Sequence, residues 1–166
     1  MIYDIVKYPH PVLRAKTEPC DDLLRPSQDA YESFFETLAA ADGVGLAAPQ
    51  IGLTCSMFVM SFNGKRRVVI NPVVLNYSKE TFAFTEGCLS IPGLRLEVVR
   101  PKKVKVEYTD ETGRRQRQQF EGMTGRIFQH EFDHLCGVLF IDRVTPELQE
   151  QAKPYLAKLE LDFGAQ

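Results

Sequence analysis

The sequence lacks an apolar run long enough to cross a membrane, and its first residues contain no apolar segment like that of a secretory signal peptide. It also lacks the paired cysteine spacing of a disulfide framework, because its four cysteines are scattered. Scattered cysteines are typical of reducing compartments. We therefore expect a cytoplasmic protein without membrane contact. A protein of an organelle stroma or matrix, or a virus-encoded one, would share these properties.

The sequence also lacks a large excess of one charge, because its 20 basic and 22 acidic residues give a net charge of −2. No overall basic field therefore favours nucleic-acid binding. Internal repeats, phosphate-binding loops and the βαβ alternation of a Rossmann fold are absent as well. Three basic clusters indicate either a transient ribosome contact or, as the preferred interpretation, solvated hairpins: Lys65-Arg66-Arg67, Lys102-Lys103-Lys105 and Arg114-Arg115-Arg117.

What is present suffices for one folded domain. The chain has 166 residues, of which 44% are hydrophobic and 25% charged, as in soluble globular proteins. We expect a single domain over residues 1–166, with a C-terminal helix or tail at about 146–166. Antiparallel strands before a late helix indicate an α+β fold, in which antiparallel β-sheets pack around a central helix.

Local patterns predict the individual elements. Ser27 is a suitable N-cap for a helix to residue 41, which Gly43 would end. A helix over 123–136 is expected, and a short one from residue 146 would stop before Pro154. Asn63-Gly64 predicts a tight turn between the first two strands. The predicted strands are 55–61, 66–70, 73–76, 80–84, 96–100, 103–108 and 115–120.

The most specific short motif is His-Glu-Phe-Asp-His at residues 130–134. On a helix, His130 and His134 leave the same face one turn apart, and both can bind one divalent ion. Glu131 lies beside the first of them and can hold a water molecule without binding the ion. This H-E-x-x-H pattern is typical of metal-assisted hydrolysis, although it also occurs by chance on solvated helices.

A third ligand is expected because a catalytic zinc-type site has three protein ligands and one open position. Cys88, in Glu86-Gly87-Cys88-Leu89-Ser90, is the candidate. Two imidazoles and a thiolate suit zinc, iron(II), cobalt(II) or nickel(II). Taken alone, Cys88 would more often be a buried structural thiol.

A glycine-rich segment lies upstream, with the sequence Gly-Val-Gly-Leu-Ala-Ala-Pro-Gln at residues 43–50. Its glycines allow the backbone to lie against an extended peptide. Gln50 offers an amide that can donate a hydrogen bond to an oxyanion.

These three motifs, in this order, resemble those of the peptide deformylase family. The similarity extends from about residue 8 to residue 142, and it includes Ser90-Ile91-Pro92-Gly93 and Arg100-Pro101. Members of that family remove the formyl group from the N-terminal formyl-methionine of new polypeptides. The resemblance therefore implies a metal-dependent hydrolase that acts on N-formylmethionyl peptides.

The resemblance also implies roles for individual residues. Cys88, His130 and His134 would be the metal ligands. Glu131 would be the general base that takes a proton from the activated water and passes it to the leaving amine. Gln50 and the backbone N–H of Leu89 would stabilise the oxyanion.

Substrate contacts follow from the same resemblance. The backbones of Gly45 and Gly87 would pair with the peptide in a strand-like manner. Val44, Glu86, Ile127 and His130 would line the methionine pocket, with Phe84 and Met123 as further candidates. The chain departs from the family just before the third motif, where Met123-Thr124-Gly125 replaces the common Leu-Leu-Ala.

Two other functions remain open at this stage. A zinc peptidase that cuts internal bonds also uses H-E-x-x-H, but a cysteine ligand within Glu-Gly-Cys-Leu-Ser argues against it. A non-catalytic binder of formylated peptides would not need every ligand, base and donor. We expect one divalent ion, with iron(II) as the native metal and Zn²⁺, Ni²⁺ or Co²⁺ as alternatives, and a monomer that binds no specific nucleic acid.

Overall fold

The computed structural model describes residues 1–21 and 26–165, and it has the predicted α+β architecture. Five antiparallel strands form the larger sheet in the order β1-β2-β3-β6-β7, and two form the smaller one, β4-β5. The strands are β1 (Gly45–Ala47), β2 (Met57–Phe62), β3 (Lys65–Tyr77), β4 (Thr81–Cys88), β5 (Ile91–Pro101), β6 (Lys103–Thr109) and β7 (Arg115–Glu121). The helices are α1 (Gln28–Ala40), α2 (Gly122–Leu135) and α3 (Pro146–Gly164), with 3₁₀ turns at Pro11–Arg14, Ala48–Ile51 and Phe140–Asp142.

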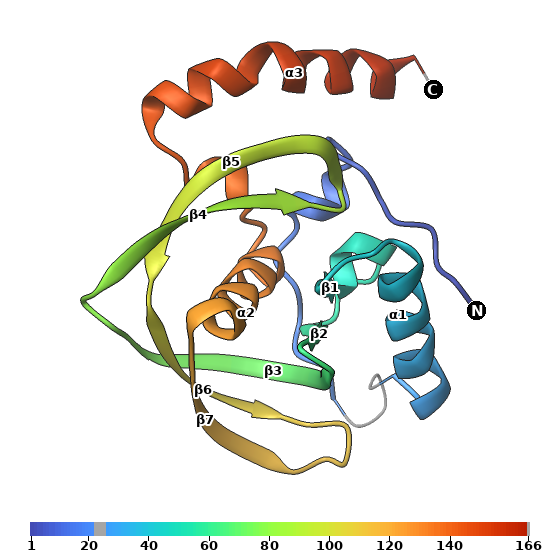
Figure 1. Cartoon of the computed structure of the whole chain (residues 1–166). Helices are drawn as coiled ribbons and strands as arrows, with labels where there is room; N and C mark the ends of the chain where they lie inside the picture. The colour runs from blue at the N-terminus through green and yellow to red at the C-terminus, as the bar shows by residue number, and fades with distance from the viewer. Residues whose placement is uncertain (22–25, 166) are drawn as a thin grey trace.

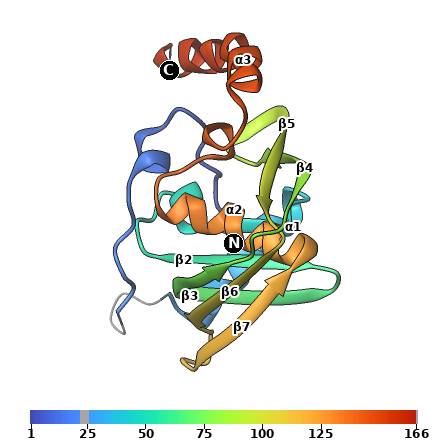
Figure 2. The ribbon, with the colours of Figure 1, turned by 90° about the vertical axis from the view of Figure 1, so that its left-hand side faces the viewer.

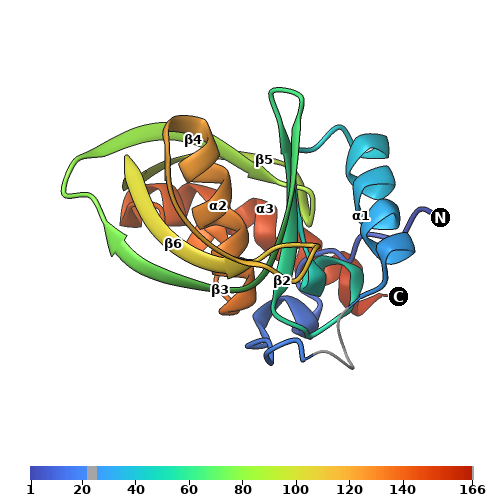
Figure 3. The same ribbon diagram turned by 90° about the horizontal axis from the view of Figure 1, so that it is seen from below.

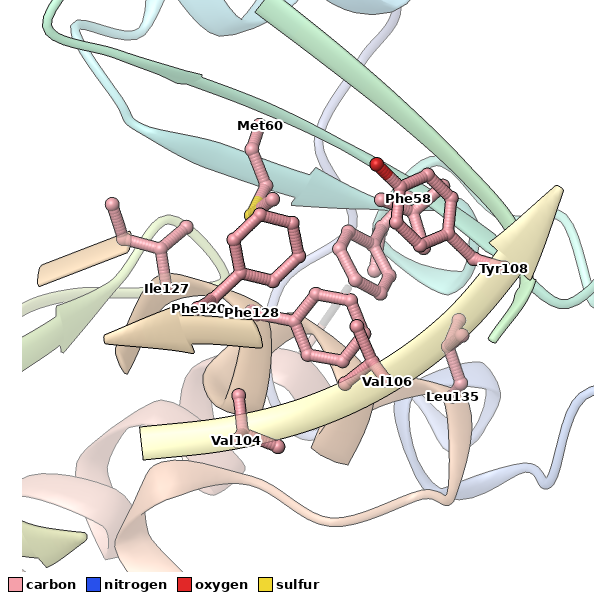
Figure 4. Packing of buried hydrophobic residues seen from close by; sticks show 11 residues of the cluster. Phe58, Met60, Val104, Val106, Tyr108, Phe120, Ile127, Phe128 and Leu135 are labelled. Atoms are coloured by element: carbon pink, nitrogen blue, oxygen red, sulfur yellow. The ribbon is translucent and has the colours of Figure 1, made fainter. Parts of the chain in front are cut away.

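Helix α2 lies at the centre, between the β4–β5 pair and the larger sheet (Figure 1). Its apolar side packs on that sheet through aromatic rings (Figure 4). The Phe128 ring centroid is 5.1 Å from that of Phe58 and 5.5 Å from that of Phe120. Its other side faces β4 and β5 through charged groups. The metal-motif helix is therefore held between two sheets.

Helix α1 begins as the sequence predicts. The Ser27 hydroxyl accepts a hydrogen bond from the Ala30 N–H at 3.2 Å. The helix buries Phe34 and Leu38 against β2. Its end differs in detail from the prediction, because the helix ends at Ala40 and the left-handed residue that follows it is Asp42, with φ 55°, and not Gly43. The Gly43 N–H then donates to the Leu38 carbonyl, 3.0 Å away.

The β2–β3 hairpin confirms the predicted turn. Asn63 and Gly64 both have positive φ angles, as the tight turn requires, and Phe62 pairs with Lys65. The two strands predicted at 66–70 and 73–76 are one strand, β3. Its pairing with β6 shifts register around Pro72, which explains why the sequence pattern is interrupted there.

The prediction that the last helix stops before Pro154 is wrong, because α3 continues through Pro154 to Gly164. Contacts beyond the proline hold it. Tyr155 donates a hydrogen bond to the Pro92 carbonyl, and Tyr8 donates one to Glu160 at 2.5 Å. Figure 2 shows α3 lying across the top of the molecule, over β5. Among the described residues, no helix is long and apolar enough to cross a membrane.

Candidate metal centre

Three potential metal donors converge at the centre of the fold. The donor atoms of Cys88, His130 and His134 all lie within 4.8 Å of one another. The histidines come from successive turns of α2, and Cys88 ends strand β4. The Cys88 Sγ and His134 Nε2 atoms are 3.5 Å apart. Ligands at zinc-type bond lengths and tetrahedral angles would be about 3.5 Å apart, so this pair fits one ion.

The polar atoms around these donors also fit a bound ion. Within the described part of the chain, Glu131 Oε1 is buried beside the donors without a hydrogen-bond partner, so a polar ligand can pair with it. Burial lowers the pKa of His134, and the positive charge of Arg100 lowers it further. The imidazole therefore stays neutral, which is the form that binds metals. Three protein donors leave one position of a tetrahedral ion for a ligand from outside the protein.

Glu131 lies beside the donors in a buried position. Only 4% of its surface is exposed, and burial raises the pKa of its carboxyl to about 7. Gly45 of β1 packs directly on it, since a Cβ atom at Gly45 would lie 2.5 Å from Glu131 Oε2. Gly45 therefore has a steric role as well as the peptide-pairing role that we expect for it.

Gln50 reaches the same place from the 3₁₀ turn after β1. Its side chain is buried, and its Oε1 accepts a hydrogen bond from the Ala47 N–H at 2.9 Å. Its Nε2 donates to Ser90 Oγ at 3.1 Å and lies 3.7 Å from Cys88 Sγ. The amide is thus fixed with its donor side facing the metal donors. Leu89 follows Cys88 and is half-buried.

A buried charge network supports His130. Its Nδ1 is 2.9 Å from Glu86 Oε1, which leaves Nε2 for an ion. Glu86 also accepts two hydrogen bonds from Arg100, at 2.6 and 3.0 Å, and one from Arg126, at 2.5 Å. Burial alone would raise the pKa of Glu86, but hydrogen bonds from His130 and Arg100 lower it to about 2. Arg100 continues the network to Asp133, at 2.9 Å.

A cavity of about 520 Å³ opens beside the metal donors. It lies between β1 and the end of β4, since residues of both line it. All the residues predicted to bind substrate or to act in catalysis lie on its wall: Val44, Gly45, Gln50, Phe84, Glu86, Gly87, Cys88, Leu89, Met123, Ile127, His130 and Glu131. His134 lies behind the wall, fully buried.

Two features of this site were not predicted from the sequence. Arg126 also lines the cavity, although it is 2% exposed, and it donates to the Phe82 and Val98 carbonyls as well as to Glu86. The sequence around Arg126 carries no local signal of these partners, because all three lie far away in the chain. Gly125, which stands where the family commonly has alanine, packs so closely on β7 that a Cβ atom would lie 2.9 Å from the Phe120 carbonyl oxygen.

The fold and the site together define an α+β protein with an H-E-x-x-H helix and three donors suited to one divalent ion. The model of the polypeptide deformylase family matches residues 2–150. The chain therefore belongs to the polypeptide deformylase family.

Relatives from plants and bacteria agree with this. The chain is 41% identical to peptide deformylase 1B, chloroplastic/mitochondrial, of Arabidopsis thaliana over 164 residues, which are 96% of this chain and 60% of that protein. It is 42% identical to a peptide deformylase of Thermotoga maritima over 145 residues, 87% of this chain and 88% of the relative. The chain spans about 60% of the length of the plant relatives.

Solved structures confirm the fold. A plant peptide deformylase crystal structure superposes with a TM-score of 0.90 at 40% identity, and the match covers 97% of this chain and 90% of that one. The Thermotoga maritima enzyme superposes with a TM-score of 0.82 at 42% identity, covering 88% and 99%.

Proposed function

We propose that this protein removes the formyl group from the N-terminal formyl-methionine of new polypeptides. The observation that carries the proposal is the convergence of Cys88, His130 and His134 with the buried carboxylate of Glu131 on one cavity, in a member of the deformylase family. One domain over residues 1–166 would contain the whole site.

Cys88, His130 and His134 would hold a single divalent ion. When bound, the ion would activate a water molecule and polarise the formyl carbonyl. We propose iron(II) as the native metal, with zinc, nickel or cobalt able to replace it, because a thiolate with two imidazoles suits all four. The hydrogen bond between His130 Nδ1 and Glu86 would keep the His130 ring oriented for the ion.

The other residues of the wall supply proton transfer and hydrogen bonds. Glu131 would take a proton from the attacking water and deliver it to the leaving amine. A buried carboxyl with a pKa near 7 is suited to both steps. The Gln50 amide, held by Ala47 and Ser90, and the Leu89 N–H would donate to the oxygen that becomes negative in the transition state.

The peptide would bind as an extended strand. Strand β1 is at the edge of its sheet, and Gly45 in β1 and Gly87 in β4 flank the cavity, so their backbone groups can pair with a substrate strand. The methionine side chain would lie against Val44 and Ile127. Glu86 would contribute only part of the wall, since its carboxylate is bound to arginines and His130.

The direct test is the release of formate from formyl-Met-Ala-Ser. The protein should be prepared anaerobically with iron(II), or reconstituted with nickel(II), because iron(II) oxidises in air. We expect rapid release that a chelator abolishes and that the returned metal restores. Folded, metal-loaded protein that releases no formate would contradict the proposal, and cleavage of intact casein would instead favour an internal peptidase.

The proposal extends to the cellular setting. We propose a monomer that meets formylated chains in the cytoplasm or in an organelle, with at most a transient ribosome contact. Relatives of both kinds support this range, since they include chloroplastic and bacterial proteins.

A further inference from the structure

A second, smaller cavity lies under the β2–β3 hairpin, and we call it the hairpin cavity. It has a volume of about 150 Å³. Figure 3 shows the hairpin projecting from the body of the sheet, and both α1 and α2 contact β2. The hairpin provides one wall and the first turns of α2 the other. The residues that matter for its chemistry are Met60, Phe62, Lys65, Arg67, Thr124 and Ile127.

The hairpin cavity adjoins the metal-site cavity. Ile127 lines both, and the neighbours Met123 and Thr124 line one each. Met60 and Ile127 belong to one packed cluster, and Figure 4 shows them on facing elements. A group that enters the metal-site cavity near Ile127 is therefore one side chain away from the hairpin cavity.

The register of β1 and β2 shows which part of a bound peptide would come near it. Gly45 packs on Glu131 and pairs with Met60. A peptide paired with β1, with its formyl end at Glu131, would run back along β1 towards Gly43. Because β1 and β2 are antiparallel, this direction leads towards Phe62 and the hairpin turn.

Alternation along a strand then selects one residue. Successive side chains point to opposite faces, so the third residue of the peptide faces the same side as the formyl-methionine side chain. It also lies about 7 Å further along the strand, at roughly 3.4 Å per residue. The side chain of the formyl-methionine would face Ile127. The side chain of the third peptide residue would point to the same side, closer to the β2–β3 hairpin.

The hairpin cavity has uncompensated positive charge. Among the described residues, neither Lys65 nor Arg67 forms an ion pair with a carboxylate. By contrast, Arg66 on the opposite face of β3 pairs with Glu32 at 2.9 Å. Arg67 lies over the Phe120 ring, 4.9 Å from its centroid, which orients the guanidinium but does not neutralise it. Thr124 adds a hydroxyl donor to the same wall.

We propose that the hairpin cavity binds the carboxylate of an acidic side chain at the third residue of the formylated peptide. Lys65 and Arg67 would attract the carboxylate, and the apolar surface of Met60, Phe62 and Ile127 would contact the side-chain methylenes. The enzyme would then favour nascent chains with Asp or Glu at that position. This inference rests on the proposed function and adds a sequence preference to it.

The test compares matched peptide amides, so that no terminal carboxylate is present. The kcat/KM for formate release is measured for formyl-Met-Ala-Glu-amide and formyl-Met-Ala-Gln-amide with the metal-loaded protein. Two exposed or half-buried ion pairs predict a preference for Glu of about threefold to tenfold. The preference should fall in about 1 M salt, which screens charges. Moving the Glu to the second residue should remove the preference, because that side chain faces the other way.

Variants of the charged residues test whether the hairpin cavity is the source of the preference for Glu. Lys65→Met and Arg67→Met should each reduce the Glu-to-Gln ratio, and the double variant should bring it near one. Arg66→Met removes the same charge from the other face of the hairpin and should keep the ratio. Lys65 is exposed near the turn, so its variant should fold even if Arg67→Met does not.

The outcomes separate the two proposals. Equal kcat/KM for the Glu and Gln peptides, with clear formate release from both, would overturn the acidic preference and leave the deformylase function intact. The acidic preference would also be overturned if Arg66→Met abolished it as strongly as Lys65→Met. The cause would then be the overall positive charge of the hairpin and not binding in the cavity. Release from no peptide by metal-loaded protein would overturn the proposed function and this inference with it.

Discussion

At the scale of single residues, the site depends on close contacts between groups far apart in the sequence. Glu131 is buried between Gly45 of β1 and its own helix, with one oxygen left without a partner among the described residues. The Glu86 carboxylate is hydrogen-bonded to His130, Arg100 and Arg126. The two carboxylates therefore differ in their surroundings, although both line the cavity, since Glu86 is bound to two arginines and His130 whereas Glu131 is not.

Replacing Glu131 should separate chemistry from metal binding. In Glu131→Ala, we expect kcat/KM for formyl-Met-Ala-Ser to fall by about 100-fold to 10,000-fold, because general acid–base catalysis is lost. The metal content should stay the same, since Cys88, His130 and His134 remain. Formate release with metal analysis of the same sample measures both. A variant with normal turnover would show that Glu131 is not the base.

Adding one methyl group at Gly45 should displace the Glu131 carboxylate. A Cβ atom there would lie 2.5 Å from Glu131 Oε2, so Gly45→Ala should move the carboxylate and lower kcat by about 100-fold. Gly164→Ala is the matched control, since a Cβ atom at Gly164 meets nothing within 4 Å. Equal activity of both variants would mean that the site tolerates a shifted carboxylate.

At the scale of elements, local signals and tertiary contacts compete. The Asn63-Gly64 turn and the Ser27 cap form as their sequences predict, because both act within a few residues. Helix α3 does not obey its local signal, and contacts from Tyr155 and Glu160 to other parts of the chain hold the segment beyond Pro154.

Pro154 should therefore be a weak point of α3. It cannot donate the helical hydrogen bond to the Glu150 carbonyl, and it is exposed. We expect Pro154→Ala to stabilise α3 by about 1–3 kcal/mol. Amide exchange within residues 150–160 should slow while that of α2 stays unchanged. Faster exchange in α3 would show that the proline fits its site better than alanine.

The β6–β7 turn should respond to pH through Asp110. Burial tends to raise its pKa, but hydrogen bonds from Thr112, Gln116 and the Arg114 N–H outweigh this and lower it from the ordinary value of 3.8. The stabilisation is thus present above that value and is lost as the pH falls through the lower folded-state pKa. Asp110→Asn should remove this acid sensitivity from amide exchange in the hairpin. An unchanged pH profile in the variant would exclude Asp110 as its source.

At the scale of the whole molecule, the ion would join elements that the chain connects only distantly. Cys88 belongs to β4, and both histidines belong to α2, so a bound ion links the smaller sheet to the central helix. The protein would then have a folded state that is stabilised by metal, because the unfolded chain holds the donors apart.

Metal removal should accordingly lower the melting temperature. At a free ion concentration about 1,000-fold above Kd, binding stabilises the folded state by about 4 kcal/mol. Differential scanning calorimetry with and without chelator measures the shift, and added nickel(II) should reverse it. In Cys88→Ala the shift should shrink strongly. A chelator shift of equal size in that variant would place the ion elsewhere.

The sequence by itself determined what depends on nearby residues or on complete motifs. It predicted the α+β class, the family, the central helix and the hairpin turn, and the structure and the comparisons confirm these. It also named Cys88, His130 and His134 as one donor set, and these atoms do converge. The roles of the site residues stay predictions until activity is measured.

Only the tertiary structure decided the rest. Arg126 pairs with Glu86, and Gly45 contacts Glu131, although these residues are distant in the sequence. Helix α3 continues past Pro154, where it is held by contacts with distant parts of the chain. Local propensities and motif spacing carry no information about such partners. Burial, close packing and the pairing of charges arise when the elements meet, so they appear only in the folded molecule.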